Sequence, residues 1–494
     1  MRVAFIRRSL MLAAIAVVAA AMSACQRESE GLVQVIALGD TPRLVDPDGG
    51  TLTAGEAILI DSAAQGLVRF DARGQIEPAL AETWNVSDDG LSYIFRLANG
   101  TWANGRKVTA EQVARLLRRH VGQSSRNPLK DAFAAVDDIV AMTDRVLEIR
   151  LNQPRPNLLQ LLAQPEMGLV HEGQGTGPFF IDRRKSRDGV IRLTREVATA
   201  DEEQAERQEV GLSGARPADA IRAFAAGKAD LVLGGTFADL PLAQRSKLPR
   251  RALQFDPASG LFGLIPLRAS GPLSDPEMRR LLSEAIDRDG LVAEFAVPGL
   301  APRATVLEPS LDNIPDPVPP QWAATPLAER LPALTAAARR FMTDGVAPTV
   351  RIALPEGPGA EMLLQRLKRD WGVLGLSVER ASRGQPADLR LVDEVAPSTS
   401  PAWFLRHFHC TAAAICEPRI DELLDAARTT PVAAQRSALL NEAAQRIDEL
   451  QLFIPIAAPI RWSLVGPRIA GFSGNRFAIH TLTGLEQRLD RTGE

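Results

Sequence analysis

The chain has 494 residues with a formal net charge of −3, and 45% of its residues are hydrophobic. A single hydrophobic core rarely supports a chain of this length, so we expect at least two lobes. The mildly acidic balance argues against a nucleic-acid partner, which would require a basic surface.

The N-terminus has the pattern of an export signal. Arginines at 2, 7 and 8 precede an apolar run at 10–21, which is shorter than the roughly 20 residues that span a bilayer. The sequence MSAC at 22–25 then has the form of a bacterial lipobox. We expect a signal peptide at 1–24 and lipidation of Cys25, where several acyl chains would give stable anchoring. A plain secretory signal with an incidental cysteine is the alternative, and no later segment is apolar enough to cross a membrane.

A strand is expected at 33–37, and the most regular pattern follows at 66–121. Apolar side chains occupy every second position of LSYIFRL at 91–97, which predicts a strand with one buried face. The turn sequence DDG precedes it at 88–90. Thr109 is expected to begin a helix, and Gln112 three residues later completes a capping box.

Further elements follow in chain order. We expect a strand at 146–151, a helix at 157–163, a tight turn into a strand at 175–181, a helix from 217 to Gly227 and a strand from 230. Ser274 and Glu277 predict a second capping box, at the start of a helix that runs to residue 288.

The C-terminal part begins with a proline-rich linker at 308–326 and an alanine-rich helix that ends at Met342. A strand at 349–354, a helix at 360–371 and a strand at 376–379 predict a parallel pair with a helical crossover. Two amphipathic helices at 418–450 and a strand at 452–456 follow.

Several of these phrases together resemble the extracellular solute-binding protein family 5, the dipeptide, oligopeptide and nickel-binding receptors of ABC importers. They are GLVRFD at 66–71, PALAETW at 78–84, SDDGLSYIFRL at 87–97, NGRKVTAEQV at 104–113, GTGPFFI at 175–181 and AIDR at 285–288. The start of the mature chain is similar as well, because LVDP at 44–47 resembles the family's Leu-Asp-Pro with one extra residue.

The resemblance implies an α/β, two-lobed periplasmic-binding-protein-like fold with an inserted subdomain and a cleft between the lobes. Lobe one would combine 25–60, 172–255 and 465–494, the inserted subdomain would be 61–171, and lobe two would be 256–464. It also implies a receptor that closes on its ligand without covalent chemistry, and we expect neither a cofactor nor a metal.

The family often places a ligand-binding carboxylate in a Trp-x-x-Asp-Tyr phrase of lobe two, where it pairs with the α-ammonium of a peptide. The resemblance puts Asp393 or Glu394 at that position, although the tryptophan before the acid is missing and Val395 replaces the tyrosine. We expect Asp393, Glu394 and Trp403 to contact the ligand. Arg390 is expected to meet a ligand carboxylate, and arginines 380 and 383 are further candidates.

Cys410 and Cys416 are the two cysteines left after Cys25, and an even pair in an exported protein favours a disulfide. Free thiols and a metal site with His407 and His409 are alternatives, but no second pair of ligands supports a metal. Signals for an enzyme are weak, because the sequences GLSGA and GFSGN, around serines 213 and 473, lack the second glycine of a nucleophile elbow.

Two functions remain open. The first is a lipid-anchored receptor on the periplasmic face of the envelope, a monomer that delivers a peptide or a peptide-like solute to an ABC permease and ATPase. The second is a non-transport envelope lipoprotein, a sensor or interaction module, that keeps the scaffold without a working pocket. An envelope hydrolase is a third and weaker reading.

Overall fold

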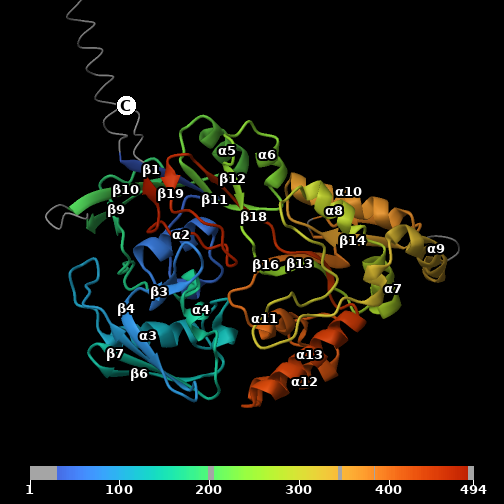
Figure 1. The fold of residues 1–494 in the computed structure, drawn as a ribbon, viewed down its shortest axis with the longest axis horizontal. Helices are drawn as coiled ribbons and strands as arrows, with labels where there is room; N and C mark the ends of the chain where they lie inside the picture. The colour runs from blue at the N-terminus through green and yellow to red at the C-terminus, as the bar shows by residue number, and fades with distance from the viewer. Residues whose placement is uncertain (1–30, 199–204, 343–347, 383, 488–494) are drawn as a thin grey trace, which may run out of the picture.

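Three large β-sheets organise the computed structural model, which describes residues 31–198, 205–342, 348–382 and 384–487 (Figure 1). We call the body on the seven-stranded sheet lobe one, the body on the four-stranded sheet the inserted subdomain, and the body on the five-stranded sheet lobe two. The signal peptide at 1–24 and Cys25 lie outside the described residues.

Lobe one is built around strand β1 (Leu32–Leu38), which is parallel to both of its neighbours. Its odd-numbered side chains pack under helix α2, whereas Ile36 on the other face joins the cluster that contains α5. Helices on both faces explain why β1 is almost wholly apolar. The strand order is β12 (Leu253–Phe255), β18 (Arg461–Val465), β11 (Leu231–Thr236), β1, β10 (Ala205–Ala215), β9 (Val190–Ala198), β8 (Phe180–Ile181), and the helices are α2 (Ala54–Ala63), α5 (Pro217–Ala225) and α6 (Leu240–Gln244).

The inserted subdomain has the strand pattern that the sequence predicts. In β5, the side chains of Tyr93, Phe95 and Leu97 are buried and those between them are more exposed. Thr109 and Gln112 form the expected capping box of α3. The sheet order is β4 (Ala81–Val86), β5 (Ser92–Leu97), β7 (Val146–Leu151), β6 (Val136–Thr143), with helices α3 (Ala110–Val121) and α4 (Leu158–Leu162) and the hairpin β2 (Val68–Phe70) and β3 (Ile76–Pro78).

Lobe two contains the predicted parallel unit, in which α10 (Pro358–Gly372) connects β14 (Thr349–Ala353) to β15 (Ser377–Arg380). The other strands are β16 (Leu389–Val395), β13 (Gly260–Pro266) and β17 (Ile454–Ala457), in the order β15-β14-β16-β13-β17. The helices are α7 (Pro276–Glu284), α8 (Arg288–Phe295), α9 (Leu327–Ala338), α11 (Pro401–Leu405), α12 (Pro418–Thr429) and α13 (Ala433–Glu449).

The remaining elements are short. A small ribbon pairs β19 (Ile469–Ala470) with β20 (Glu486–Gln487). The 3-10 turns are η1 (Pro47–Gly49), η2 (Lys130–Phe133), η3 (Pro165–Met167), η4 (Pro272–Ser274), η5 (Gln321–Ala324), η6 (Arg339–Phe341) and η7 (Arg406–Phe408).

The prediction of one helix from Ser274 to residue 288 is wrong, because two aspartates each cap a separate helix. Asp275 accepts a hydrogen bond from the amide of Glu277 at 2.8 Å and begins α7. Asp287 accepts from the amide of Gly290 at 3.0 Å and begins α8. An aspartate carboxylate is a favourable N-cap because it accepts a hydrogen bond from a free amide in the first turn of a helix. Since Asp287 caps α8 in this way, the phrase AIDR is a junction between two helices.

The GTGP turn joins the inserted subdomain back to lobe one by lying against the end of α2. The Gly177 amide donates to the Ala63 carbonyl at 2.9 Å, and the Phe179 amide donates to the Ser62 carbonyl at 3.0 Å. A Cβ atom on Gly177 would lie 2.4 Å from the Ser62 carbonyl oxygen. The turn therefore needs glycine for a close approach of two backbones.

Two short neighbouring segments carry the chain between lobe one and lobe two, from Phe255 to Gly260 and from Ala457 to Arg461. The Asp256 amide donates to the Arg461 carbonyl at 3.0 Å, so the segments run side by side. Since β18 pairs with β11 and β12, the chain re-enters the sheet of lobe one at Arg461, a few residues before the expected boundary at 465.

Candidate ligand-binding site

A cavity of about 530 Å³ lies at the junction of the two lobes. Strands β14 and β16 pair only as far as Ala353 and Arg390, and beyond that point no pairing joins them. The cavity opens where this pairing ends, and its wall on the other side is the end of β11. Its lining residues are Thr236, Phe237, Ala238, Ala353, Leu354, Pro355 and the five residues from Arg390 to Glu394.

Asp393 lines this cavity, but its carboxylate is held by an arginine of the other lobe. Arg461 Nη1 lies 2.7 Å from Asp393 Oδ1, and Nη2 donates to the Asp393 backbone carbonyl at 3.0 Å. Each side chain is 16% exposed. Burial raises the pKa of the Asp393 carboxyl above its ordinary value, and the charge and hydrogen bond of Arg461 act in the opposite direction. Sequence reasoning missed Arg461, because 68 residues separate it from its partner.

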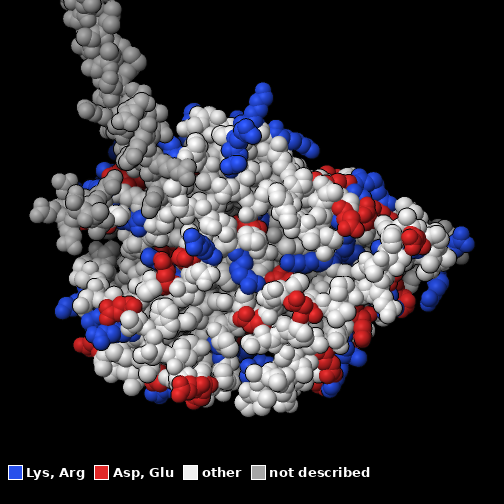
Figure 2. Space-filling model, viewed as in Figure 1, with Lys and Arg blue, Asp and Glu red and all other residues white. Residues whose placement is uncertain are grey.

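Glu394 lies next along β16 and is paired within lobe two. Its Oε2 is 3.2 Å from His407 Nε2, and the hydrogen bond from His407 lowers the pKa of the Glu394 carboxyl despite its burial. His407 Nδ1 lies 3.0 Å from the Trp403 carbonyl, so both ring nitrogens face oxygen acceptors. On the face drawn in Figure 2, acidic and basic atoms lie near one another across the middle of the molecule.

Trp403, an expected ligand contact, lies in the core of lobe two and is not among the residues that line the cavity. Its ring meets the edge of Phe404 at 5.0 Å between centroids and that of His407 at 4.9 Å. In this arrangement it supports the histidine that holds Glu394.

The candidate arginines differ in their surroundings. Arg390 is exposed and lines the cavity, and its side chain makes no hydrogen bond or ion pair with another described residue, although its charge helps to lower the pKa of the Glu394 carboxyl. Arg380 donates from Nη1 to the Pro355 carbonyl at 2.8 Å and approaches Glu361 at 3.6 Å, so its guanidinium is already engaged. Arg383 lies outside the described residues. Arg390 is thus the candidate arginine with an available charge in the cavity.

The chemistry of the other candidates is limited by their neighbours. Cys410 and Cys416 are joined by a disulfide with 5.1 Å between Cα atoms, which removes both thiols from a metal site. The hydroxyl of Ser473 donates to a backbone carbonyl at 3.3 Å, and Ser213 lies inside the seven-stranded sheet, between β1 and β9.

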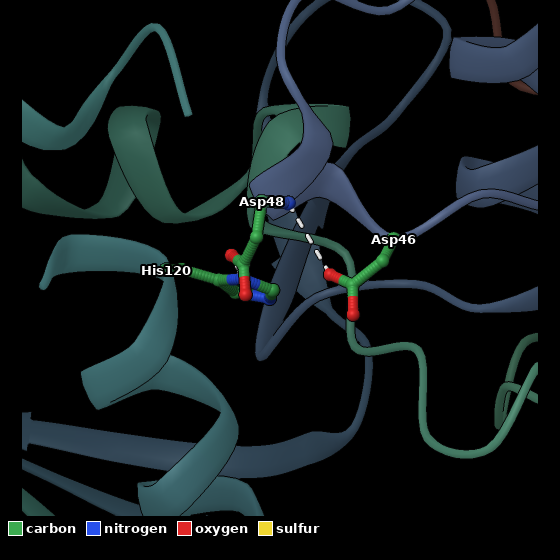
Figure 3. Close-up of side chains that lie close together, drawn as sticks. All are labelled: Asp46, Asp48 and His120. Atoms are coloured by element: carbon green, nitrogen blue, oxygen red, sulfur yellow. Dashed lines mark hydrogen bonds and ion pairs between the residues drawn. The ribbon is translucent and has the colours of Figure 1, made fainter. Parts of the chain in front are cut away.

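Figure 3 shows a polar cluster that sequence reasoning missed, in which Asp46, Asp48 and His120 bring possible metal-ligating atoms within 4.8 Å of one another. His120 is fully buried, with Nδ1 against Asp48 and Nε2 3.1 Å from the Gly168 carbonyl. Arg119 pairs with both aspartates. Both ring nitrogens face acceptors and a cation is already present, so this geometry fits an ion-pair network between lobe one and α3 better than a metal site.

Burial alone would raise the pKa of Asp48, but the hydrogen bonds and charges of His120 and Arg119 together lower it below its ordinary value. Asp46 belongs to the phrase LVDP, and its Oδ1 accepts from the Asp48 amide at 3.2 Å at the start of η1. The phrase therefore has a structural role at the base of the inserted subdomain.

The profile of the bacterial extracellular solute-binding proteins, family 5 (middle region), matches residues 75–387, which is more than half of the chain. The chain belongs to this family. Members of family 5 are receptors and not enzymes, in agreement with the weak catalytic signals of the sequence.

Two known proteins resemble this chain to different extents. The probable di/tripeptide-binding protein 5 of Pseudomonas aeruginosa is 25% identical, and the match covers 83% of this chain and 87% of that protein. The probable deoxycholate-binding periplasmic protein YgiS of Escherichia coli is 32% identical over 144 residues, which are 26% of this chain and 27% of that protein.

Solved structures support the same fold. The murein tripeptide binding protein MppA of Escherichia coli has a TM-score of 0.77 at 19% identity, covering 92% of this chain and 98% of its own. OppA of Haemophilus influenzae, in complex with the peptide RPPGFSPFR, has a TM-score of 0.76 at 16% identity, covering 92% and 99%. The expected α/β binding-protein fold is confirmed. Among the residues described, no helix has both the length and the apolar character needed to span a bilayer.

Proposed function

We propose that this protein is the substrate-binding component of an ABC importer, anchored through a lipidated Cys25 on the periplasmic face of the envelope. The observation that carries the proposal is the cavity at the junction of the lobes, whose lining includes Arg390, Asp393 and Glu394. A volume of about 530 Å³ with apolar walls and a few polar groups is typical of small-molecule sites.

Closure of the lobes on a solute is the proposed mechanism. Residues of α4 and its ends contact lobe two: Gln164 donates to the Pro397 carbonyl at 2.6 Å, Asn157 donates to the Thr399 hydroxyl at 2.9 Å, and Gln160 accepts from the Thr399 amide at 2.9 Å. These contacts require the inserted subdomain and lobe two to lie close together. A solute that touches both sides of the cavity binds this arrangement better than an open one and so shifts the population toward it.

The solute is proposed to be a peptide or a peptide-like compound, in line with the names of the di/tripeptide-binding relative and the OppA complex. The protein is proposed to act as a monomer that docks on a permease with its ATPase.

Native mass spectrometry of residues 26–494, purified from a periplasmic expression host, tests the pocket first. A co-purifying small mass identifies the solute class, and loss of that solute's uptake on deletion of the gene in the native host establishes transport. Incorporation of labelled palmitate by wild type and not by Cys25→Ser tests the anchor. Uptake that is unchanged by the deletion would contradict the importer function.

A second function has one observation in its favour: both acidic groups of the cavity are already paired within the chain. Such internal pairing is expected of a non-transport envelope lipoprotein whose pocket does not bind a solute. It predicts an apo mass, no stabilisation by a broad solute library and no uptake defect.

A further inference from the structure

The charges of the cavity are not equivalent as ligand-binding groups. Asp393 already receives two contacts from Arg461, one on the carboxylate and one on the backbone carbonyl. Arg461 faces Thr236, a wall residue, across the pairing of β18 and β11, so its guanidinium reaches Asp393 from the strand next to the cavity wall. A ligand ammonium could reach Asp393 only by displacing this guanidinium and leaving it partly buried without a counter-ion.

Glu394 is also engaged. His407 Nε2 lies 3.2 Å from its carboxylate, and the backbone carbonyl of Trp403 holds the other ring nitrogen at 3.0 Å. The Trp403 carbonyl therefore orients the His407 ring so that Nε2 faces Glu394. Neither acid of the cavity is left without a partner from the chain.

Arg390 presents the opposite case. It follows Leu389 at the last position where β16 still pairs with β14, and its exposed side chain has no partner among the described residues. A guanidinium offers parallel donors that match a carboxylate. Phe237, Ala238 and Leu354 are apolar residues that line the same cavity.

We propose that the cavity selects a carboxylate with an apolar body and without a free ammonium group, such as an N-blocked peptide or a simple hydrophobic acid. Arg390 receives the carboxylate, the apolar wall takes the body, and Arg461 keeps Asp393 from accepting an amine. This inference rests on the proposed function and specifies the substrate class of the same site.

The test uses residues 26–494 and two matched pairs of probes, measured by thermal shift and calorimetry. The pairs are N-acetyl-leucyl-phenylalanine against leucyl-phenylalanine amide, and 4-phenylbutyrate against 4-phenylbutylamine. We expect the two acids to bind and the two amines not to bind. Arg390→Gln weakens binding of the acids by about tenfold or more, because a hydrogen-bonded charge pair is lost. Arg268→Gln is the control, since Arg268 is half-exposed, lies 3.5 Å from Asp388 and is outside the cavity.

A second variant tests the role of Arg461. Arg461→Met leaves Asp393 without its partner, and we expect the amine probes to gain binding in this variant alone. Stronger binding of the amines to wild type would overturn the inference and leave the receptor function intact. Equal binding of the acids to wild type and Arg390→Gln would also overturn it. If no probe of either kind binds, the inference fails, and an apo mass in the native spectrum would then count against the receptor function as well.

Discussion

Arg461 of lobe one and Asp393 of lobe two form an ion pair across the junction of the lobes, with 2.7 Å between Nη1 and Oδ1. The pair connects β18, which follows a short crossing segment, to β16, which lines the cavity. The ion pair that neutralises Asp393 in the cavity therefore also joins lobe one to lobe two.

We predict that Arg461→Met lowers the free energy of unfolding by about 3 kcal/mol, because it leaves a largely buried carboxylate without its counter-ion. Adding Asp393→Asn should recover part of this loss, since the unpaired charge is then removed. Chemical denaturation of the two single variants and the double variant measures the coupling. Strictly additive losses would show that the two side chains do not interact.

Asp448 gives a pH dependence of stability. Burial raises the pKa of its carboxyl from 3.8 to about 8, so the folded protein keeps a proton that the unfolded chain releases between those values. Stability therefore falls as the pH rises from about 4 to about 8 and is level above that range. In the wild type, the Val306 amide donates to Asp448 Oδ1 at 2.8 Å. Asp448→Asn mimics the protonated carboxyl, and its side-chain oxygen can still accept this hydrogen bond.

We expect this variant to melt higher than wild type at pH 8 and to show a flatter profile of melting temperature between pH 5 and pH 8. Glu356→Gln removes an exposed carboxylate that does not act on Asp448, and this control should leave the profile unchanged. An equal slope in Asp448→Asn and wild type would contradict the raised pKa.

The disulfide predicts a loss of stability on reduction. Cys410 and Cys416 close a loop with a sequence separation of six, for which chain entropy gives about 2 kcal/mol. Residues 26–494 contain no other cysteine, so dithiothreitol and the double variant Cys410→Ser, Cys416→Ser should lower the melting temperature equally. A double variant that still responds to dithiothreitol would be inconsistent with this account.

The cluster of Asp46, Asp48 and His120 is predicted to stabilise the fold without binding a metal. His120→Ala removes a fully buried ring from between Asp48 and the Gly168 carbonyl, and we expect a loss of about 3 kcal/mol from the unpaired groups left behind. EDTA followed by Zn²⁺ should leave the melting temperature of wild type unchanged. Stabilisation by Zn²⁺ that is abolished in His120→Ala would reverse this interpretation.

Much of the fold could be predicted because the signals are local. The capping box of Thr109 and Gln112 and the unit of β14, α10 and β15 depend on residues a few positions apart. The start of α7 was misplaced because Ser274 and Asp275 are adjacent and both can cap a helix, so only geometry decides between them.

The site was less predictable, since its properties come from contacts between distant segments. Asp393 and Glu394 do lie at the cavity, but nothing in their local sequence shows that Arg461 and His407 pair with them. The cavity itself arises where the pairing of β14 and β16 ends at Arg390, which is a property of the whole sheet.

The two neighbouring segments that join the lobes also determine how far each part of lobe two would move in a rotation of the lobes. A rotation about the line on which they lie moves each atom in proportion to its distance from that line. The cavity is beside these segments, whereas α9 lies at the end of lobe two farthest from them (Figure 1). If the lobes rotate about these segments when the solute binds, a small movement at the cavity is accompanied by the largest displacement at α9.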